Sequence, residues 1–105
     1  MEIKNLTPHA ITICNNAGEV IRVFQSEGLV RLKASTVNAG QIDGVPVSNT
    51  IFGEPEGLPE YTDGKFYIVS QIVKSALPKR LDLLVPAEIV RDLNGQIIGC
   101  KSLGL

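Results

Sequence analysis

Short runs of alternating apolar and polar residues dominate the chain and predict β-strands. Residues 11–13 and residues 30–34 alternate with the period of two that is typical of a strand with one buried face. Residues 20–24 are also strand-like, and the Asn- and Gly-containing segment 15–18 before them is typical of a connecting turn. We therefore expect the first half of the chain to be a meander of short antiparallel strands.

Three dipeptides predict tight turns between strands: Asp43-Gly44, Asp63-Gly64 and Asn94-Gly95. Each supplies the positive-φ residues that two-residue hairpin turns require. The first joins a strand ending near residue 42 to a strand at 45–47, and the last joins residues 88–93 to residues 96–101. Hairpins are therefore expected to be the main building unit of the fold.

The remaining pattern predicts one helix, two further strands and a loop. The helix begins with Ser70 as its N-cap and ends before Pro78, with Ile72, Val73, Ala76 and Leu77 on its inward face. Residues 66–69 form the strand before it, and residues 83–85 form a strand that Pro86 closes. Residues 53–60 contain too much Gly and Pro for a regular element and are predicted to be a surface loop.

These elements predict an α+β fold that is mostly β: a small antiparallel sheet or barrel of hairpins with one short helix near residues 70–77. A length of 105 residues is typical of one domain, so residues 1–105 are expected to form a single unit. Because Trp is absent and aromatic residues make up only 5%, Ile, Val and Leu must supply most of the core.

The overall charge and the cysteine content exclude several classes of function. A formal net charge of -1 provides no field that would attract a nucleic acid. No apolar run approaches the roughly 20 residues that cross a bilayer, so we expect no membrane partner and a cytoplasmic location. Cys14 and Cys100 are too few for a disulfide framework or a metal cluster. Two buried or half-buried thiols are the expectation, although a bridge between them is geometrically possible.

Two polar groups are candidates for chemistry. His9, the only histidine, could act as an acid or base near neutral pH or bond a ligand, or could instead anchor the N-terminal turn. Arg80 could grip a phosphate or carboxylate through its planar fork, with Asp82 holding it in place or accepting a ribose hydroxyl. The alternative is a local ion pair of little energetic value.

Catalytic motifs are not found in the sequence. Ser70 and Ser75 lack a Gly-x-Ser-x-Gly context, and no glycine-rich phosphate loop is present. We therefore expect a protein without cofactor or metal, and the absence of motifs counts modestly against an enzyme. Of the aromatic residues near the Gly/Pro loop, Phe52 and Tyr67 are expected in the core, and Tyr61 is the exposed candidate for stacking on a base.

Several segments together resemble a family of small proteins encoded by bacteriophages, prophages and bacteria. They are Asn5-Leu6-Thr7-Pro8-His9-Ala10-Ile11, Asp43-Gly44-Val45-Pro46-Val47, Phe52-Gly53-Glu54 with Leu58-Pro59, Tyr67-Ile68-Val69-Ser70, Ala76-Leu77-Pro78 with Arg80 and Asp82, and Val90-Arg91-Asp92 to Gly99-Cys100. The likeness spans nearly the whole chain. It implies a small binding protein that acts in the cytoplasm of a bacterial host.

The resemblance leads to one main hypothesis and two alternatives. The main hypothesis is a sponge that evades host immunity by sequestering a nucleotide-derived signal, ADP-ribose-like or a cyclic nucleotide. The alternatives are an enzyme acting on a nucleotide or small metabolite through His9, and a protein-binding module that inhibits a host protein or serves in the virion. A homo-oligomer could bring residues of the site together from two chains. The candidate ligand-binding residues are Thr7, His9, Tyr61, Ser70, Arg80, Asp82 and Arg91.

Overall fold

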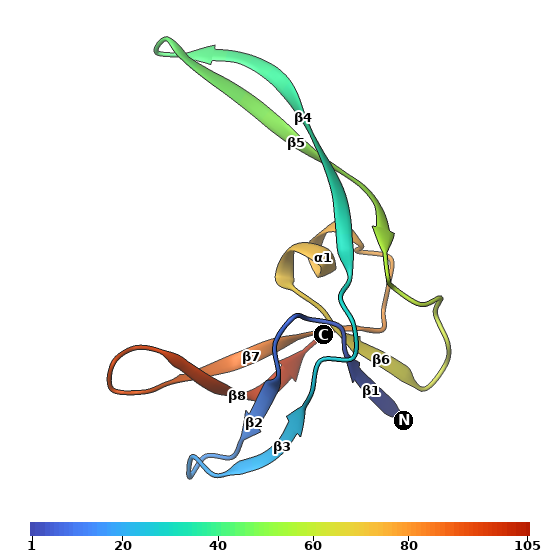
Figure 1. Ribbon diagram of the computed structural model, residues 1–105, viewed down its shortest axis with the longest axis vertical. Helices are drawn as coiled ribbons and strands as arrows, with labels where there is room; N and C mark the ends of the chain where they lie inside the picture. The colour runs from blue at the N-terminus through green and yellow to red at the C-terminus, as the bar shows by residue number, and fades with distance from the viewer.

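The computed structural model describes all residues, 1–105, and contains eight strands and one helix (Figure 1). The fold is α+β and mostly β, as predicted. The elements are β1 (Glu2–Asn5), β2 (Ile11–Cys14), β3 (Val20–Phe24), β4 (Arg31–Ile42), β5 (Val45–Glu56), β6 (Lys65–Ile68), α1 (Gln71–Ala76), β7 (Leu83–Arg91) and β8 (Ile97–Gly104).

Six of the strands form one sheet in the order β1-β6-β7-β8-β2-β3. The hairpin pairs β2–β3 and β7–β8 are antiparallel, as the turn sequences predict. Parallel pairs join these hairpins to the rest of the sheet: β1 with β6, β6 with β7, and β2 with β8. The two ends of the chain therefore lie in the same sheet.

The core is small and lies on both sides of the sheet at β6, the second strand in its order. Tyr67 and Val69 pack on one side with Val73 of α1, while Ile68 packs on the other side with Phe24 and Cys100 among its neighbours. This follows from the alternation of side chains along a strand. Only 15 of the 105 residues are buried, so much of the apolar content lies outside this core.

The prediction of three hairpin turns is confirmed at two of the three dipeptides. Asp43 and Gly44 have φ values of 50° and 76° and connect β4 to β5, and Asn94-Gly95 connects β7 to β8. Asp63-Gly64 also forms a turn, but it leads into β6, which pairs with β1 and β7 rather than with the preceding strand. The hairpin prediction is wrong there because the turn sequence cannot specify which strand the chain joins next.

β4 and β5 form a separate two-stranded sheet that projects from the rest of the molecule (Figure 1). We call this hairpin the arm. Each of its strands has 12 residues, so the predicted meander of short strands is wrong for this segment. The predicted loop at 53–60 is wrong for residues 53–56, which belong to β5. Pro55 is tolerated because the pairing is irregular beside it and each strand of the arm has a free edge.

The helix confirms two predictions, and the helix and β7 each correct one. The Ser70 hydroxyl caps α1 by accepting a hydrogen bond from the Val73 amide at 3.3 Å, and Val73 is buried as expected. Ile72, which was expected to face inward, is 62% exposed. Pro86 does not close its strand, because β7 continues to Arg91. β6 ends opposite Leu84, so Pro86 lies where β7 has only β8 as a neighbour.

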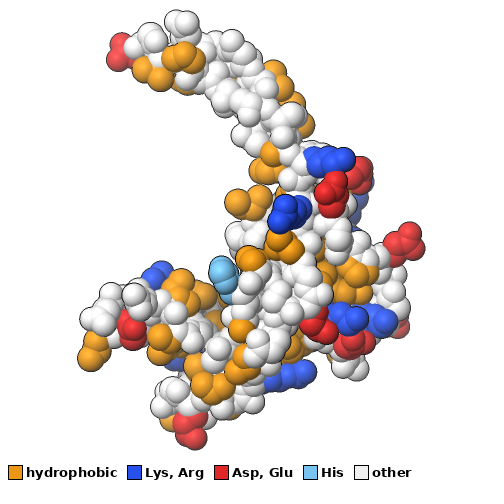
Figure 2. Space-filling model, in the orientation of Figure 1, with side chains coloured by type: hydrophobic (Ala, Val, Ile, Leu, Met, Phe, Trp, Pro, Cys, Tyr) orange, Lys and Arg blue, Asp and Glu red, His pale blue; other side chains and the backbone are white.

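The molecule is flat and elongated, with extents of 51 × 39 × 19 Å. The arm and the β7–β8 hairpin extend in different directions from the body (Figure 2). The structure contains no helix of the length and apolar character that crossing a membrane requires.

Candidate functional site

The N-terminal turn is held together by the buried side chain of Asn5. Its Nδ2 donates to the carbonyl oxygens of His9 at 2.7 Å and Phe24 at 2.9 Å, and its Oδ1 accepts from the Thr7 amide at 3.0 Å. The Thr7 hydroxyl lies 2.6 Å from this Oδ1 and 3.0 Å from the His9 carbonyl oxygen. Thr7 is buried, and its hydroxyl, which was proposed to bind a ligand, is already engaged in hydrogen bonds within the turn.

His9 lies on the surface (Figure 2, pale blue). The turn is anchored through the carbonyl oxygen of His9, and the imidazole makes no hydrogen bond or ion pair with the rest of the chain. The ring is accessible to a ligand. A general acid or base, however, also needs a positioned partner or substrate group within hydrogen-bond reach.

Arg80 and Asp82 form the best-defined polar contact in the structure. Arg80 Nε lies 2.8 Å from Asp82 Oδ1, and Nη2 lies 2.7 Å from Oδ2, so the guanidinium grips the carboxylate with two bonds. The Asp82 side chain is 1% exposed and the Arg80 side chain 23%. The hydrogen bond to Asp82 raises the pKa of Arg80 above its ordinary value. This pair is more deeply buried than the local surface pair considered from the sequence.

The same arginine also holds the loop that carries Tyr61. Arg80 Nη2 donates to the Pro59 carbonyl oxygen at 2.9 Å, which ties residues 57–64 to the end of α1. Tyr61 follows in this loop and is 59% exposed, as predicted. The structure thus brings the Tyr61 loop, Arg80 and Asp82 into one region. Both Nη2 hydrogens and the Nε hydrogen of Arg80 are engaged, which leaves only Nη1 free.

The other two candidate residues lie apart from this pair or are already engaged. Ser70 uses its hydroxyl to cap α1. Arg91 lies at the opposite end of β7 from Asp82, where Nη1 donates to the Gly95 carbonyl oxygen at 2.9 Å. Eight residue steps of extended strand separate Leu83 from Arg91, or about 26 Å. One chain therefore does not bring Arg91 next to Arg80.

Of the aromatic predictions, Tyr67 is confirmed and Phe52 is wrong. Tyr67 is 3% exposed and belongs to the core. Phe52 lies on β5 at the base of the arm and is 45% exposed. The arm leaves the body at this point, so the chain provides no second layer to cover the ring.

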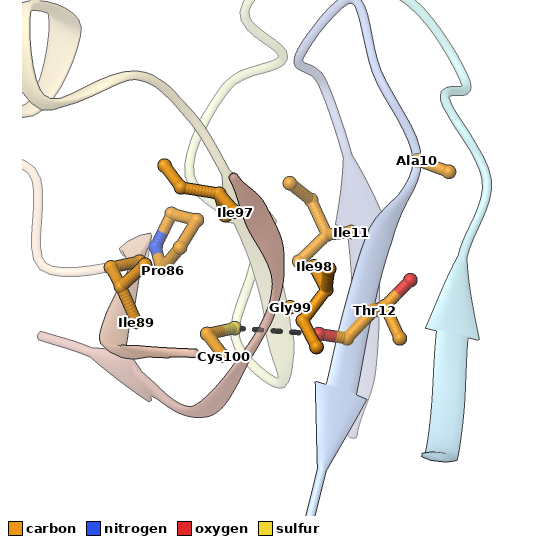
Figure 3. A pocket seen from close by; sticks show the side chains of 9 residues that line it. All are labelled: Ala10, Ile11, Thr12, Pro86, Ile89, Ile97, Ile98, Gly99 and Cys100. Carbon is orange, nitrogen blue, oxygen red and sulfur yellow. Dashed lines mark hydrogen bonds between the residues drawn. The ribbon is translucent and has the colours of Figure 1, made fainter. Parts of the chain in front are cut away.

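An apolar hollow of about 230 Å³ lies between β2 and the β7–β8 hairpin. Ile11, Pro86, Ile89, Ile97 and Ile98 line it, and Figure 3 shows their side chains together with Cys100, whose Sγ lies 3.7 Å from the Thr12 carbonyl oxygen. None of its nine lining residues carries a charge. The hollow is therefore poorly suited to a phosphate-containing ligand. Its residues come from distant segments, so the sequence did not reveal it.

The two cysteines are free and buried, as expected. Cys100 pairs with Ile13, which precedes Cys14, so the two thiols lie in neighbouring strands. Burial raises the pKa of the Cys100 thiol. A thiol with a raised pKa is a weak nucleophile, which is not what a catalytic cysteine requires.

The arm carries a polar face and an apolar face. Val45, Val47 and Ile51 alternate along β5 and share one face. Val37 pairs with Asn49 on this face, and Ile42 pairs with Val45. We call Val37, Ile42, Val45, Val47 and Ile51 the apolar arm face. Apart from Val47, which is partly buried, these side chains are 47–68% exposed. The opposite face carries Thr36, Asn38, Ser48 and Thr50.

The arm also has unprotected strand edges. β4 and β5 pair only with each other, so each presents a row of unpaired backbone groups along its outer side. Exposed edges are usually blunted by charged residues, proline or bulges. Between Ala34 and Phe52 the only charged residue is Asp43 in the turn, although Pro46 and an irregular pairing at 38–41 disturb the tip. The middle of the arm therefore combines free edges with an apolar face, and the sequence analysis did not identify this surface.

No group of three or more His, Cys, Asp and Glu side chains is placed to hold a metal ion. No family model, no curated protein and no solved structure matches the chain.

Proposed function

We propose that the protein is a non-enzymatic protein-binding module that docks through its β4–β5 arm. The observation that carries the proposal is the apolar arm face, whose aliphatic side chains stand away from both core clusters. A two-stranded hairpin is marginally stable in water unless another layer covers it. A partner protein that covers this face would supply that layer, and it could also pair with a free strand edge.

The geometry of one chain gives less support to capture of an ADP-ribose-like or cyclic nucleotide ligand. Tight capture requires on the order of 10 kcal/mol and therefore several charge-assisted contacts. Most of the donors of Arg80 are engaged with Asp82 and Pro59, and Arg91 lies at the far end of β7. Such a site would have to combine residues from two chains. An enzyme acting through His9 has still less support, because no second catalytic group lies against the ring.

The resemblance to phage and prophage proteins implies two roles for a module of this kind. It would inhibit a host protein or serve in the virion, and an exposed apolar arm suits either role. Both uses require that the arm be covered by protein in the working state. The first experiment therefore concerns the arm itself rather than the identity of any partner.

The test compares two adjacent substitutions on β5. Ile51→Asp places a charge on the apolar arm face, whereas Thr50→Asp places the same charge on the polar face one residue away. Native mass spectrometry of the protein isolated from the cells that express it would report both assembly and any retained small molecule. We expect the wild type and Thr50→Asp to occur in a complex, and Ile51→Asp to occur as a free chain of 11.3 kDa.

Two results would contradict the proposal. One is a wild-type protein that occurs only as a free chain, and the other is a complex that Ile51→Asp leaves intact. A free chain that retains a nucleotide-derived molecule would support the capture hypothesis instead.

A further inference from the structure

The isolated chain exposes far more surface than a compact protein of its mass. A monomer of 11.3 kDa typically exposes about 5,700 Å², whereas this chain exposes 7383 Å². Its radius of gyration is 16.8 Å, against about 13 Å for a compact domain of this length. The surplus of about 1,700 Å² is close to twice the roughly 800 Å² that each partner contributes to a standard interface. The chain therefore has the surface of a subunit with two contact sites.

The first apolar surface is the apolar arm face, on the part of the arm from Ala34 to Phe52. The chain exposes about 70 Å² per residue on average, and at this average residues 34–52 expose about 1,300 Å². Covering one of the two faces of this ribbon would bury about 650 Å² of the arm, which is within the roughly 600–1,000 Å² that one partner contributes to a specific interface. The arm can therefore supply one complete contact site if its partner offers a surface of similar size.

The second apolar surface is the hollow of about 230 Å³ between β2 and the β7–β8 hairpin, which we call the body hollow. Ile89, Ile97 and Ile98 line it and are 44%, 59% and 52% exposed. A cavity of about 150 Å³ holds the six carbons of benzene, so the body hollow has room for about nine carbons. Two aliphatic side chains from one face of a hairpin would therefore fill it.

The two surfaces match in chemistry and shape but do not meet within one chain. The strands of the arm pair only with each other and project from the body, whereas the body hollow lies between strands of the six-stranded sheet (Figures 1 and 3). Neither the apolar arm face nor the lining of the body hollow carries a charge. The arm face presents a protruding row of aliphatic side chains, and the body hollow is concave. A second copy can therefore provide what each surface lacks.

From these observations we propose that the arm of each copy of this chain binds the body hollow of another copy. The aliphatic side chains of the apolar arm face contact Ile89, Ile97 and Ile98 of the second copy. Because the two surfaces differ, each copy has one neighbour at its arm and another at its hollow, and this head-to-tail contact builds a ring or a filament. The inference rests on the proposed function, because it names the protein that covers the arm. Two contact sites per copy also account for the whole surplus of exposed surface.

The test measures association of the purified full-length protein by sedimentation velocity over a range of concentrations. We expect the wild type to form assemblies larger than two chains of 11.3 kDa. Ile51→Asp on the arm and Ile98→Asp in the body hollow should each weaken association by about 100-fold or more, because each buries an unpaired carboxylate in the contact. Two matched controls should change it less than about threefold. They are Thr50→Asp on the polar face of the arm, and Leu93→Asp at the exposed tip of the β7–β8 hairpin, outside the hollow.

Mixing the two defective variants tests the pairing of the surfaces directly. The Ile51→Asp protein keeps an intact body hollow, and the Ile98→Asp protein keeps an intact arm. Each variant alone should sediment as a single chain, whereas the mixture should form pairs with one chain of each kind and nothing larger. Such a pair would also show that both variants are folded.

The outcomes separate this inference from the proposed function. Purified wild type that is monomeric at all concentrations overturns the second-copy proposal. If that monomer still enters a complex in cells, and Ile51→Asp but not Thr50→Asp abolishes the complex, the arm binds another protein and the proposed function stands. An assembly that Ile51→Asp leaves intact overturns both. An assembly that depends on Ile51 but tolerates Ile98→Asp, or a mixture that forms no pairs, overturns the contact between arm and body hollow.

Discussion

Replacing Arg80 with alanine removes the only hydrogen-bond partner of a buried carboxylate. Asp82 is 1% exposed and accepts bonds of 2.8 and 2.7 Å from the guanidinium. Removing one partner of such a pair leaves an uncompensated charge and typically costs about 3–5 kcal/mol. The total free energy of unfolding of a small domain is about 5–15 kcal/mol. We therefore expect Arg80→Ala to lose a large part of its stability.

A double variant separates the buried charge from the loss of side-chain packing. Arg80→Met combined with Asp82→Leu replaces both charged groups with apolar side chains of similar size, so no carboxylate remains unpaired. The hydrogen bond from Arg80 to the Pro59 carbonyl oxygen is still lost, which costs about 1 kcal/mol. The double variant should therefore be more stable than Arg80→Ala by about 2–4 kcal/mol, although it carries more substitutions.

Urea unfolding followed by far-ultraviolet circular dichroism measures both effects, since the chain has no Trp for fluorescence. With an m value of about 2 kcal/mol/M, the midpoint of Arg80→Ala should lie about 2 M below that of the wild type. A loss below about 1 kcal/mol, or a double variant no more stable than Arg80→Ala, would refute the reasoning. The result also matters for function, because a destabilised Arg80→Ala protein could lose a ligand or partner without Arg80 touching it.

Three further predictions concern the body of the molecule. Asn5→Ala removes a buried side chain that makes four hydrogen bonds, and it should lower the free energy of unfolding by about 2–4 kcal/mol in urea titrations. The Cys100 thiol has a raised pKa in the folded state. Its contribution to the free energy of unfolding should therefore be fully present below the unfolded-state pKa of the thiol, near 9, and should be lost as pH rises above that value. The fall should be smaller in Cys100→Ala, and equal falls in both proteins would contradict this. Gly57→Ala places a Cβ 2.5 Å from the Leu29 carbonyl oxygen and should cost more than about 2 kcal/mol in thermal unfolding, whereas Gly18→Ala, with a similar positive φ and open space around it, should cost about 1.

Local signals in the sequence predicted the parts of the structure that depend on neighbouring residues. The Asp43-Gly44 turn and the Ser70 cap are set by the conformations of single residues. The contact between Arg80 and Asp82 spans only two positions, so it too could be anticipated. The parallel pairing of β1 with β6 joins residues about sixty positions apart, and no local pattern specifies it. The separation of Arg91 from Arg80 depends on the continuation of β7 to Arg91, whereas the sequence pattern predicted that this strand ends at Pro86.

The apolar pattern of the arm indicates a face that is suited to burial, but the pattern does not identify the chain that would cover it. Charged residues are available to the arm only next to the body, where Lys33 and Glu56 lie 3.2 Å apart. Between Ala34 and Phe52 the hairpin is exposed to solvent, and this part carries one charged residue, Asp43, and a row of aliphatic side chains. A hairpin that worked as an exposed spacer would gain solubility from charges at these positions and would lose nothing in packing. Phe52 and Ile72, whose predicted burial is wrong, both line an apolar hollow of about 310 Å³ between the base of the arm and α1. Both errors therefore have one physical explanation: these side chains are patterned for burial that a single chain does not provide.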